Sequence, residues 1–267
     1  MSILVTGATG NVGRLVIDEL IARGAPTVRA LTVDPAKADL PDGVEVAVGS
    51  IHKPDSVVPA LQGISTLYLA PHPPTAQAVV DRAVAAGVQR IVDLTGPEGS
   101  WWDEIEPVVE ASGLGWTHLK PGEFTHNALM WADQIKISRE VRDAYPKSAN
   151  ALIDLADIAA VAAVTLLDDR HLGRAYPLTG PETLTRAEKV AIMGRAVGAD
   201  VPYLEIDREA AIAQWEPSMG EFAQWYVDGA ADLVEHPQQV DPSLAELLDR
   251  PPTTFADWAE ANADQWR

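Results

Sequence analysis

A glycine-rich loop at the start of the chain constrains its fold more than any other feature. The short apolar run 3–5 leads directly into Thr6-Gly7-Ala8-Thr9-Gly10-Asn11-Val12-Gly13-Arg14, whose glycines stand three residues apart. Between a strand and a helix, such glycines permit a tight turn, a close backbone approach to a pyrophosphate and close helix–strand packing. The first turn of the helix then offers free amide groups to the phosphates. An ordinary glycine-rich turn is the alternative. The position directly after a strand favours dinucleotide binding by Thr6, Gly7, Thr9, Gly10, Asn11, Val12, Gly13 and Arg14.

Short apolar segments alternate with longer amphipathic segments through the first half of the chain. Most are dense in Val, Ile, Leu or Thr without a polar alternation, as is typical of strands buried on both faces of a parallel sheet. Strands that alternate with helices indicate an α/β fold, here a Rossmann-type doubly wound parallel sheet. The expected strands are 3–6, 28–32, 44–48, 66–70, 90–94 and 116–120, and the expected helices are 12–23, 54–61, 75–86 and 101–112.

The second half of the chain is more helical. It begins with an Ala-rich segment, 155–167, and then offers a strand at 175–179, a helix at 186–197 and a short strand at 203–206. Thr185 and Glu188 have the spacing of a capping box at the start of the helix. We expect a dinucleotide-binding domain at residues 1–150, and remaining sheet elements with a smaller, mostly helical substrate-cleft lobe at residues 151–267.

Charge and composition exclude several classes of protein. The chain has no cysteine, which excludes disulfides and Cys-based metal sites and agrees with a cytoplasmic location. Its net charge of −19 argues against nucleic acid as a partner, because binding a polyanion depends on Lys and Arg. The longest apolar run, 158–167, is far shorter than the roughly 20 residues of a membrane span. The segment 200–267 holds 15 acidic and 3 basic residues, so an anionic ligand is expected in the N-terminal part.

Several stretches together resemble the NmrA-like branch of the atypical short-chain dehydrogenase/reductase family. This resemblance implies a Rossmann fold, an NAD(P) cofactor, and a position beside the nicotinamide for Pro121, Gly122 and Phe124. The stretches are the loop 6–14, Val28-Arg29-Ala30-Leu31, Ala86-Gly87-Val88-Gln89-Arg90-Ile91-Val92, Ala111-Ser112-Gly113-Leu114-Gly115-Trp116-Thr117, Leu119-Lys120-Pro121-Gly122-Glu123-Phe124 with Asn127, Ile153-Asp154-Leu155-Ala156-Asp157-Ile158-Ala159, and Arg250-Pro251-Pro252-Thr253-Thr254-Phe255.

The choice between NAD and NADP is made at the end of the second strand. An acidic residue there binds the ribose hydroxyls of NAD, whereas an Arg accepts the NADP phosphate. Relatives often have Arg where Val33 stands, and Asp34 is either a ribose ligand or the cap of the next turn. Arg14 and Lys37 remain as nearby cations, so we favour NADP(H) over NAD(H).

Further cofactor contacts are expected where parallel strands end, because ligands of doubly wound sheets lie at the carboxyl ends of the strands. This rule nominates Ser50 and Ile51 for the adenine, and residues after the fourth and fifth strands for the rest of the dinucleotide. These residues are Leu69, Ala70, Pro71 and Thr95.

The usual catalytic dyad of the superfamily, a Tyr with a Lys four residues later, is missing. Four residues after the five tyrosines stand His72, Ala149, Gly180, Asp207 and Ala230. The candidate catalytic residues are therefore His126, Thr95 and Lys120, with a loop histidine, a loop cap and a structural ion pair as the respective alternatives. His118 lies within a strand and is expected to be buried and hydrogen-bonded. The histidines show no metal-ligand spacing on a helix, so no metal site is expected.

Trp102, His126 and Asn127 are the expected substrate contacts. Trp102 falls off the apolar stripe that Trp101, Ile105 and Val108 form at helical spacing, which leaves it to stack on a flat substrate. We expect an NAD(P)H-dependent reductase of a small organic molecule, quinone-like or carbonyl, acting as a monomer or homodimer. A nucleotide-sensing regulator without turnover and a redox-neutral isomerase or dehydratase are the alternatives.

Overall fold

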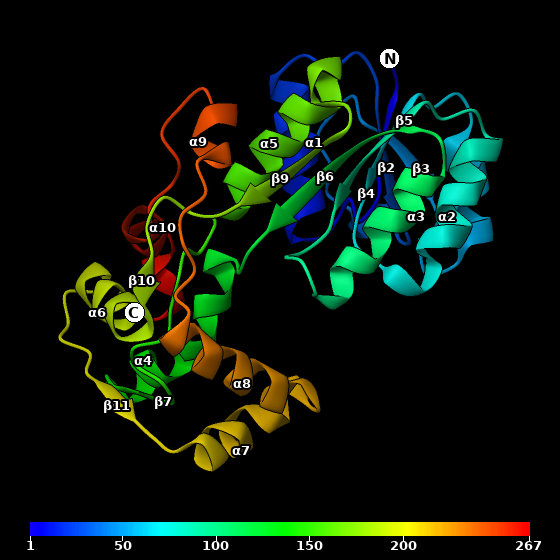
Figure 1. The fold of residues 1–267 in the computed structure, drawn as a ribbon. Coiled ribbons are helices and arrows are strands. Elements are labelled where there is room, and N and C mark those ends of the chain that lie inside the picture. The colour runs from blue at the N-terminus through cyan, green and yellow to red at the C-terminus, as the bar shows by residue number, and fades with distance from the viewer. The chain divides into compact units, whose positions relative to one another are not determined.

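The computed structural model describes all 267 residues. Its main element is a sheet in which every neighbouring pair of strands is parallel, with the strand order β3-β2-β1-β4-β5-β6-β9 (Figure 1). The order reverses between β1 and β4, which is the switch point of a doubly wound sheet. The predicted α/β fold class is confirmed. The strands are β1 (Ile3–Val5), β2 (Val28–Thr32), β3 (Glu45–Val48), β4 (Thr66–Leu69), β5 (Arg90–Leu94), β6 (Gly115–Pro121) and β9 (Arg174–Leu178).

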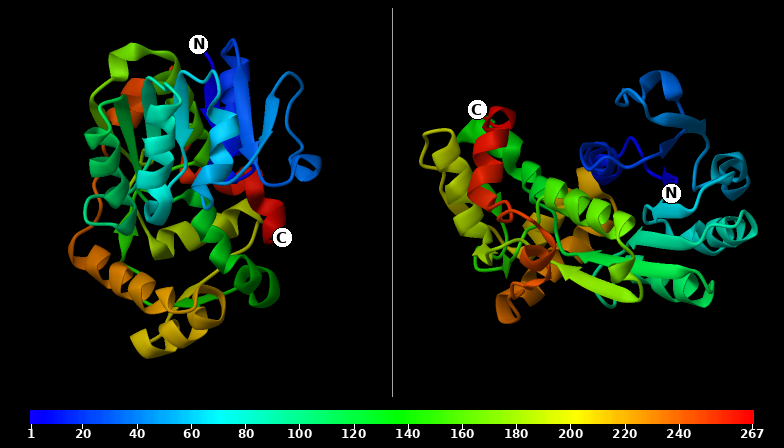
Figure 2. Two further views of the ribbon diagram at one scale, coloured as in Figure 1. Left: turned by 90° about the vertical axis from the view of Figure 1, so that its right-hand side faces the viewer. Right: turned by 90° about the horizontal axis from the view of Figure 1, so that it is seen from above.

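Helices cover both faces of this sheet (Figures 1 and 2). On one face an apolar core joins the strands to η2 (Pro54–Leu61), α2 (Pro73–Ala85) and α3 (Ile105–Ala111). On the other face α1 (Asn11–Ala22) packs against α5 (Leu155–Leu167). β4 and β5 are buried at every residue, as expected of central strands covered on both sides. The short elements of the same part are η1 (Pro35–Lys37), η3 (Trp101–Glu104), η5 (Asp169–His171) and α9 (Ser243–Leu247).

Two predicted helices are wrong in type. The segment Pro54–Leu61 is a 3-10 helix, because Pro59 inside it has no amide hydrogen to donate. The segment 101–112 begins as the 3-10 turn η3 and becomes α-helical only at Ile105. A proline is tolerated in the first turn of an α-helix, and Pro107 therefore sets where α3 can begin. Trp101 consequently does not join the predicted apolar stripe, and 50% of its surface is exposed.

Glycines with positive φ and polar side chains mark the ends of several helices. Gly24, Gly63, Gly87 and Gly113 all have φ between 73° and 82°. Thr185 and Glu188 form the predicted capping box, in which each side chain bonds the backbone of the other. Asp34 caps η1 by accepting a hydrogen bond from the amide of Ala36 at 3.2 Å.

Contacts along the chain divide it into two compact units. Unit 1 holds the sheet and consists of Met1–Gly122, Leu155–Leu178 and Ser243–Arg250, and unit 2 consists of Glu123–Asp154, Thr179–Pro242 and Pro251–Arg267. The chain therefore passes between the units several times. The domain boundary at residue 150 stays a prediction. No helix of the structure has both the length and the apolar character that crossing a membrane requires.

Unit 2 is mostly helical, as predicted for the C-terminal part. Its core collects the side chains of Trp131, Trp215, Phe255, Trp258 and Trp266. The segment 125–143, for which the sequence shows no clear periodicity, forms two helices and a strand. The elements are η4 (Thr125–Trp131), α4 (Ala132–Ser138), β7 (Val141–Asp143), β8 (Ala149–Asn150), β10 (Leu184–Thr185), α6 (Arg186–Ala196), β11 (Tyr203–Glu205), α7 (Arg208–Met219), α8 (Phe222–Glu235), α10 (Phe255–Asn262) and η6 (Ala263–Gln265).

Candidate cofactor and catalytic site

The glycine loop has the geometry that a bound pyrophosphate requires. Gly7 turns the chain with φ +60°, and a Cβ on it would lie 2.9 Å from the Cβ of Ala70. A Cβ on Gly13 would lie 2.2 Å from the carbonyl oxygen of Gly7, so α1 can approach β1 this closely only with glycine there. Gly10 has no positive φ, and its Cβ would meet the Gly7 oxygen at 3.2 Å, a close contact but a milder one than those at Gly7 and Gly13.

The amino end of α1 is open. Gly10 is the N-cap, no side chain caps the helix, and the first turn has no acidic residue. The exposed residues Thr9, Gly10 and Asn11 surround this end. A helix that leaves its first amides to a ligand is suited to an anion. Thr6 has another task, because its hydroxyl donates to the Tyr68 carbonyl at 3.0 Å and accepts from the Ala70 amide at 2.8 Å, which holds β1 and β4 together at the switch point.

The other predicted cofactor residues of unit 1 lie at one edge of the sheet. All strands are parallel, so the residues that follow β3, β4, β5 and β6 come together at the carboxyl edge. Ile51, Leu69 and Thr95 are buried there, and Ser50, Ala70 and Gly122 are half-buried. Phe124, the remaining predicted cofactor residue, belongs to unit 2 with His126 and Asn127.

Two cations stand beside the end of β2. The Nε atom of Arg14 lies 3.3 Å from Asp18, and its Nη1 atom donates to the carbonyl of Asp39. The Nζ atom of Lys37 lies 3.4 Å from Asp34, and 85% of the lysine side chain is exposed. Asp34 is therefore engaged as a cap and by Lys37.

Thr95 and Lys120, two of the predicted catalytic residues, meet at a carboxylate that the sequence analysis did not single out. The hydroxyl of Thr95 donates to Glu106 Oε1 at 2.9 Å, and the Nζ atom of Lys120 lies 2.6 Å from the same oxygen. Glu106 is on α3, and Lys120 is near the end of β6. The ion pair lies in the wall of a cavity of about 480 Å³, lined by Glu98, Asp103, Glu104, Glu106, Pro107, Glu110 and Lys120.

His118 is buried and hydrogen-bonded, as predicted. Its Nδ1 atom lies 2.8 Å from Asp93 Oδ1, and the two residues are direct neighbours across β6 and β5. The ring stacks on Trp116 with centroids 4.3 Å apart. Burial by itself lowers the pKa of His118, but the hydrogen bond and charge of Asp93, with two further carboxylates, outweigh it and raise this pKa. The Tyr68 hydroxyl is buried without a hydrogen-bond partner, and burial raises its pKa, so Tyr68 is no substitute for the catalytic tyrosine.

Known proteins similar to this chain agree with the geometry. A family model described as NAD(P)H-binding matches residues 7–169. The chain belongs to this NAD(P)H-binding family. It is 34% identical to a (4-alkanoyl-5-oxo-2,5-dihydrofuran-3-yl)methyl phosphate reductase of Streptomyces griseus and 34% identical to an NAD(P)H azoreductase of Xenophilus azovorans, in each case over 98% of both chains.

A solved structure of the same family was determined with its cofactor. The chain resembles an NADPH-dependent quinone oxidoreductase of Escherichia coli complexed with NADPH, with a TM-score of 0.86 and 26% identity over 97% of this chain and 99% of that one. The resemblance to NmrA-like, atypical short-chain dehydrogenase/reductase proteins is thereby confirmed. NAD(P)H binding follows from membership, and the family includes NAD(P)H-dependent reductases.

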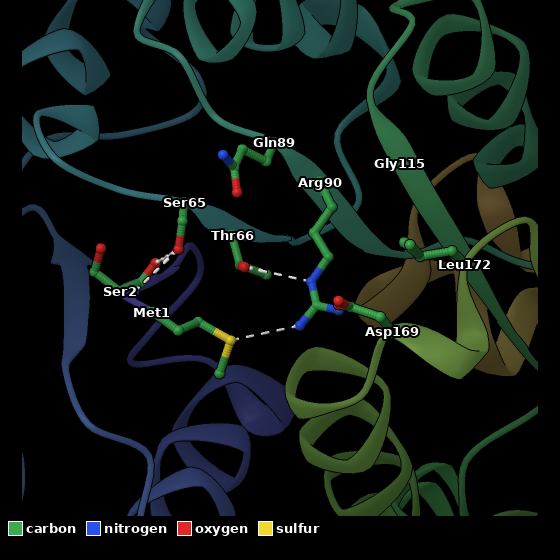
Figure 3. A pocket seen from close by; sticks show the side chains of 9 residues that line it. All are labelled: Met1, Ser2, Ser65, Thr66, Gln89, Arg90, Gly115, Asp169 and Leu172. Atoms are coloured by element: carbon green, nitrogen blue, oxygen red, sulfur yellow. Dashed lines mark hydrogen bonds and ion pairs between the residues drawn. The ribbon is translucent and has the colours of Figure 1, made fainter.

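A hollow in unit 1 lies at the amino edge of the sheet, opposite the carboxyl edge. This hollow of about 540 Å³ is lined by residues that precede or begin strands, among them Ser2, Ser65, Gln89 and Gly115 (Figure 3). Arg90 points across it toward Asp169, with 2.6 Å between Nη1 and Oδ1. Ligands of doubly wound sheets lie beyond the carboxyl ends, so this hollow is not the dinucleotide site.

The predicted substrate residues differ in their surroundings. Trp102 is 36% exposed and packs edge-on against Trp101, with ring centroids 6.1 Å apart. His126 and Asn127 are exposed on η4, and the Asn127 amide donates to Glu123 at 3.3 Å. The sequence signal that could have revealed Glu106 is the spacing of Glu106 and Glu110, one helical turn apart and opposite a strand with alternating basic residues.

Proposed function

We propose that this member of the NAD(P)H-binding family is a reductase that transfers a hydride from NADPH to a small, electron-poor organic acceptor. The observation that carries the proposal is the open glycine loop, in which a side chain on Gly7 or Gly13 would clash with its neighbours. The residues proposed to hold the dinucleotide are those predicted from the sequence. They are Thr6, Gly7, Thr9, Gly10, Asn11, Val12, Gly13, Arg14, Ser50, Ile51, Leu69, Ala70, Pro71, Thr95, Pro121, Gly122 and Phe124.

The names of the relatives support the class of acceptor. They describe reductases of a quinone, an azo compound and an oxo-dihydrofuran phosphate. Each name denotes a compound with a double bond that can accept a hydride. Such an acceptor takes a hydride without the strong acid activation that an isolated carbonyl needs, and positioning supplies much of the rate. This chemistry is compatible with the absence of the Tyr–Lys dyad. Trp102, His126 and Asn127 remain the proposed substrate contacts.

NADPH is the proposed cofactor because Arg14 and Lys37 stand beside the end of β2. Neither residue is buried, so both cations can turn from Asp18, Asp39 and Asp34 toward a phosphate. We expect Arg14→Ala to weaken NADPH binding by about tenfold and NADH binding much less, since one charge-assisted contact contributes about 1.5–3 kcal/mol. Equal dissociation constants for NADPH in both proteins would contradict this role of Arg14.

The decisive experiment combines binding and turnover. NADPH and NADH binding is measured by calorimetry, and their oxidation is followed with 2-methyl-1,4-naphthoquinone, an azo dye and an aldehyde. In Gly10→Ala a methyl group occupies the surface that faces the pyrophosphate, and we expect both binding and turnover to be lost while the fold persists. Gly229→Ala is the matched control, because a Cβ on Gly229 would meet nothing within 4 Å.

The second candidate function is a regulator that senses the nucleotide without turnover. The absence of the Tyr–Lys dyad favours it. Tight cofactor binding without oxidation by any acceptor would support it and contradict the reductase. A redox-neutral activity would show as product formation with no net change in the cofactor.

A further inference from the structure

The strand β6 and the helix α3 face each other with charged side chains at matching intervals. His118 and Lys120 are two residues apart on β6, so both point to the same face of the sheet. Glu106 and Glu110 are four residues apart on α3, so they share one side of the helix. Lys120 pairs with Glu106 at 2.6 Å, and His118 Nε2 lies 3.6 Å from Glu110 Oε1. We call these four residues the β6–α3 ladder.

At the His118 end of the ladder, one buried ring nitrogen has no hydrogen-bond partner. The side chain of His118 is 1% exposed, and its Nε2 atom has no hydrogen-bond partner. Asp93 occupies the other ring nitrogen, and Trp116 covers the ring face. A buried polar atom without a partner costs stability, so its persistence calls for an explanation. The carboxylate that Nε2 faces belongs to Glu110, which also lines the cavity.

The charges around His118 favour its protonated form. Asp93 approaches from β5, and Glu106 and Glu110 approach from α3, while Tyr68 on β4 stays neutral next to Asp93. The one cation on the same face of β6 is Lys120, which Glu106 neutralises. A proton on Nε2 is therefore stabilised by the charge of the carboxylates but is hydrogen-bonded to none of them. The carboxylate near Nε2 is that of Glu110, at 3.6 Å.

At the other end of the ladder, the side chains of Lys120 and Glu106 are 16% and 18% exposed. Lys120 is the penultimate residue of β6 and stands beside Thr95, which follows β5, at the carboxyl edge of the sheet. Reduction of the acceptor takes up one hydride and one proton. The ammonium group of a lysine can release a proton, whereas an arginine at the same place would keep it.

We propose that the β6–α3 ladder supplies this proton, with Lys120 as the catalytic residue and His118 as a positioning residue that stores the next proton. The inference rests on the proposed reductase function. As the acceptor takes the hydride, an N–H bond of Lys120 breaks and an O–H or N–H bond forms on the acceptor. The neutral amine then regains a proton through Glu106 from a water in the cavity. The hydroxide that is left takes a proton from His118 through Glu110, and bulk solvent returns a proton to His118 before the next turnover.

Lys120→Arg and Lys120→Gln test the catalytic residue with 2-methyl-1,4-naphthoquinone as the probe. Arginine keeps the ion pair with Glu106 but holds its proton, so a purely structural Lys120 predicts wild-type activity for the arginine variant. The ladder predicts that kcat falls by at least about tenfold in both variants, within the range of general acid catalysis. The dissociation constant of NADPH should stay within about twofold. Wild-type kcat in Lys120→Arg would overturn the proposal.

Glu110→Gln tests the stored proton without relying on turnover. The ionisation of His118 is followed by NMR of its imidazole carbons, and the ladder predicts a lower pKa in this variant than in the wild-type protein. Glu104→Gln is the control, because it removes a carboxylate of the same cavity that does not face His118. The pH dependence of kcat should shift in the same direction for Glu110→Gln only. An unchanged His118 pKa, or an equal change in the control, would overturn its role.

Failure of the proposed function would look different. A wild-type protein that binds no NADPH, or that reduces no acceptor, overturns the reductase and the ladder's role together. If the wild-type protein is an active reductase and replacing Lys120 leaves kcat unchanged, only the proposed role of the ladder is overturned.

Discussion

Unit 1 buries Asp93 against a histidine, whereas unit 2 buries Asp143 against an arginine and two tryptophans. Asp93 has one side-chain partner, the Nδ1 atom of His118. Asp143 accepts hydrogen bonds from Arg186 at 2.5 Å, from the indoles of Trp131 at 2.9 Å and Trp215 at 3.1 Å, and from the amide of Ala144 at 2.8 Å. Both carboxylates are fully buried.

The difference lies in which partner can lose its charge. An arginine stays protonated at every accessible pH, so the Asp143 site is a permanent ion pair. Its guanidinium also lies over the rings of Trp131 and Tyr226, 5.3 and 5.4 Å from their centroids. A histidine gains or loses its proton near neutrality, and the Asp93 site can therefore change charge. The permanent pair holds a core together, and the titrating pair lies in the unit where we propose chemistry.

The largest effect is expected from breaking the permanent pair. Asp143→Asn leaves Arg186 buried without a counter-charge, and such a loss costs about 3–5 kcal/mol of unfolding free energy. Chemical denaturation measures this loss of unfolding free energy, and hydrogen exchange of the amides in α6 shows whether it arises near Arg186. Replacing both partners, as Asp143→Leu with Arg186→Met, should recover much of the loss. If Asp143→Asn is as stable as the wild-type protein, the ion pair does not hold the core of unit 2 together, and the proposed difference between the two units is wrong.

Lys189 provides a pH test within unit 2. Burial, with repulsion from Arg186, lowers its pKa to about 8 although Glu123 attracts it. Between this pKa and the ordinary lysine value the unfolded chain binds more protons, so the free energy of unfolding rises with pH across that window. The gain is at most about 3 kcal/mol. Lys189→Met should abolish this rise, and subtracting its pH curve from the wild-type curve removes the contribution of the tyrosines.

Asp93→Asn should show the opposite pH behaviour in unit 1. We expect a loss of about 1–3 kcal/mol in unfolding free energy, the usual cost of a buried group without its partner. Because the folded-state pKa of His118 is raised, its stabilising contribution is complete below the unfolded value and disappears as the pH rises through the folded value. Burial also raises the pKa of Asp93, so the loss on substitution should be largest below the unfolded histidine value but above the pKa of Asp93. A loss that does not vary with pH would mean that His118 does not titrate in the folded protein.

The smallest effect concerns the helix starts of the two units. In unit 2 α6 is capped by Thr185 and Glu188, whereas in unit 1 α1 has no side-chain cap. Thr185→Ala should cost about 1 kcal/mol, measured as a shift of the denaturation midpoint. Gly10→Ser should cap α1 and weaken NADPH binding, with only a small change in stability, because the gain from the cap is offset by the 3.2 Å contact of the new Cβ with the Gly7 oxygen. Unimpaired NADPH binding by that variant would contradict a ligand at the open helix end.

Much of unit 1 could be predicted from the sequence because its signals are local. β2 and β5 begin and end where the apolar runs do, and the glycine loop specifies the turn, the helix start and the ligand without reference to the rest of the chain. The two helices predicted in the wrong form contain prolines, at 59 and 107, whose positions relative to each segment decide its geometry. The carboxyl-edge residues followed from the rule that parallel strands end together.

The sequence by itself determined the fold class, the cofactor loop and the absence of a Tyr–Lys pair, because each depends on residues that are near in the chain. Only the tertiary structure decided that Glu106 joins Thr95 to Lys120, that Asp93 meets His118, and that Asp143 gathers Arg186 with two indoles. The hydrogen-bonded partners in these groups lie 11 to 72 residues apart in the chain. No periodicity links such positions, and burial forces each polar group to find its partner across the fold.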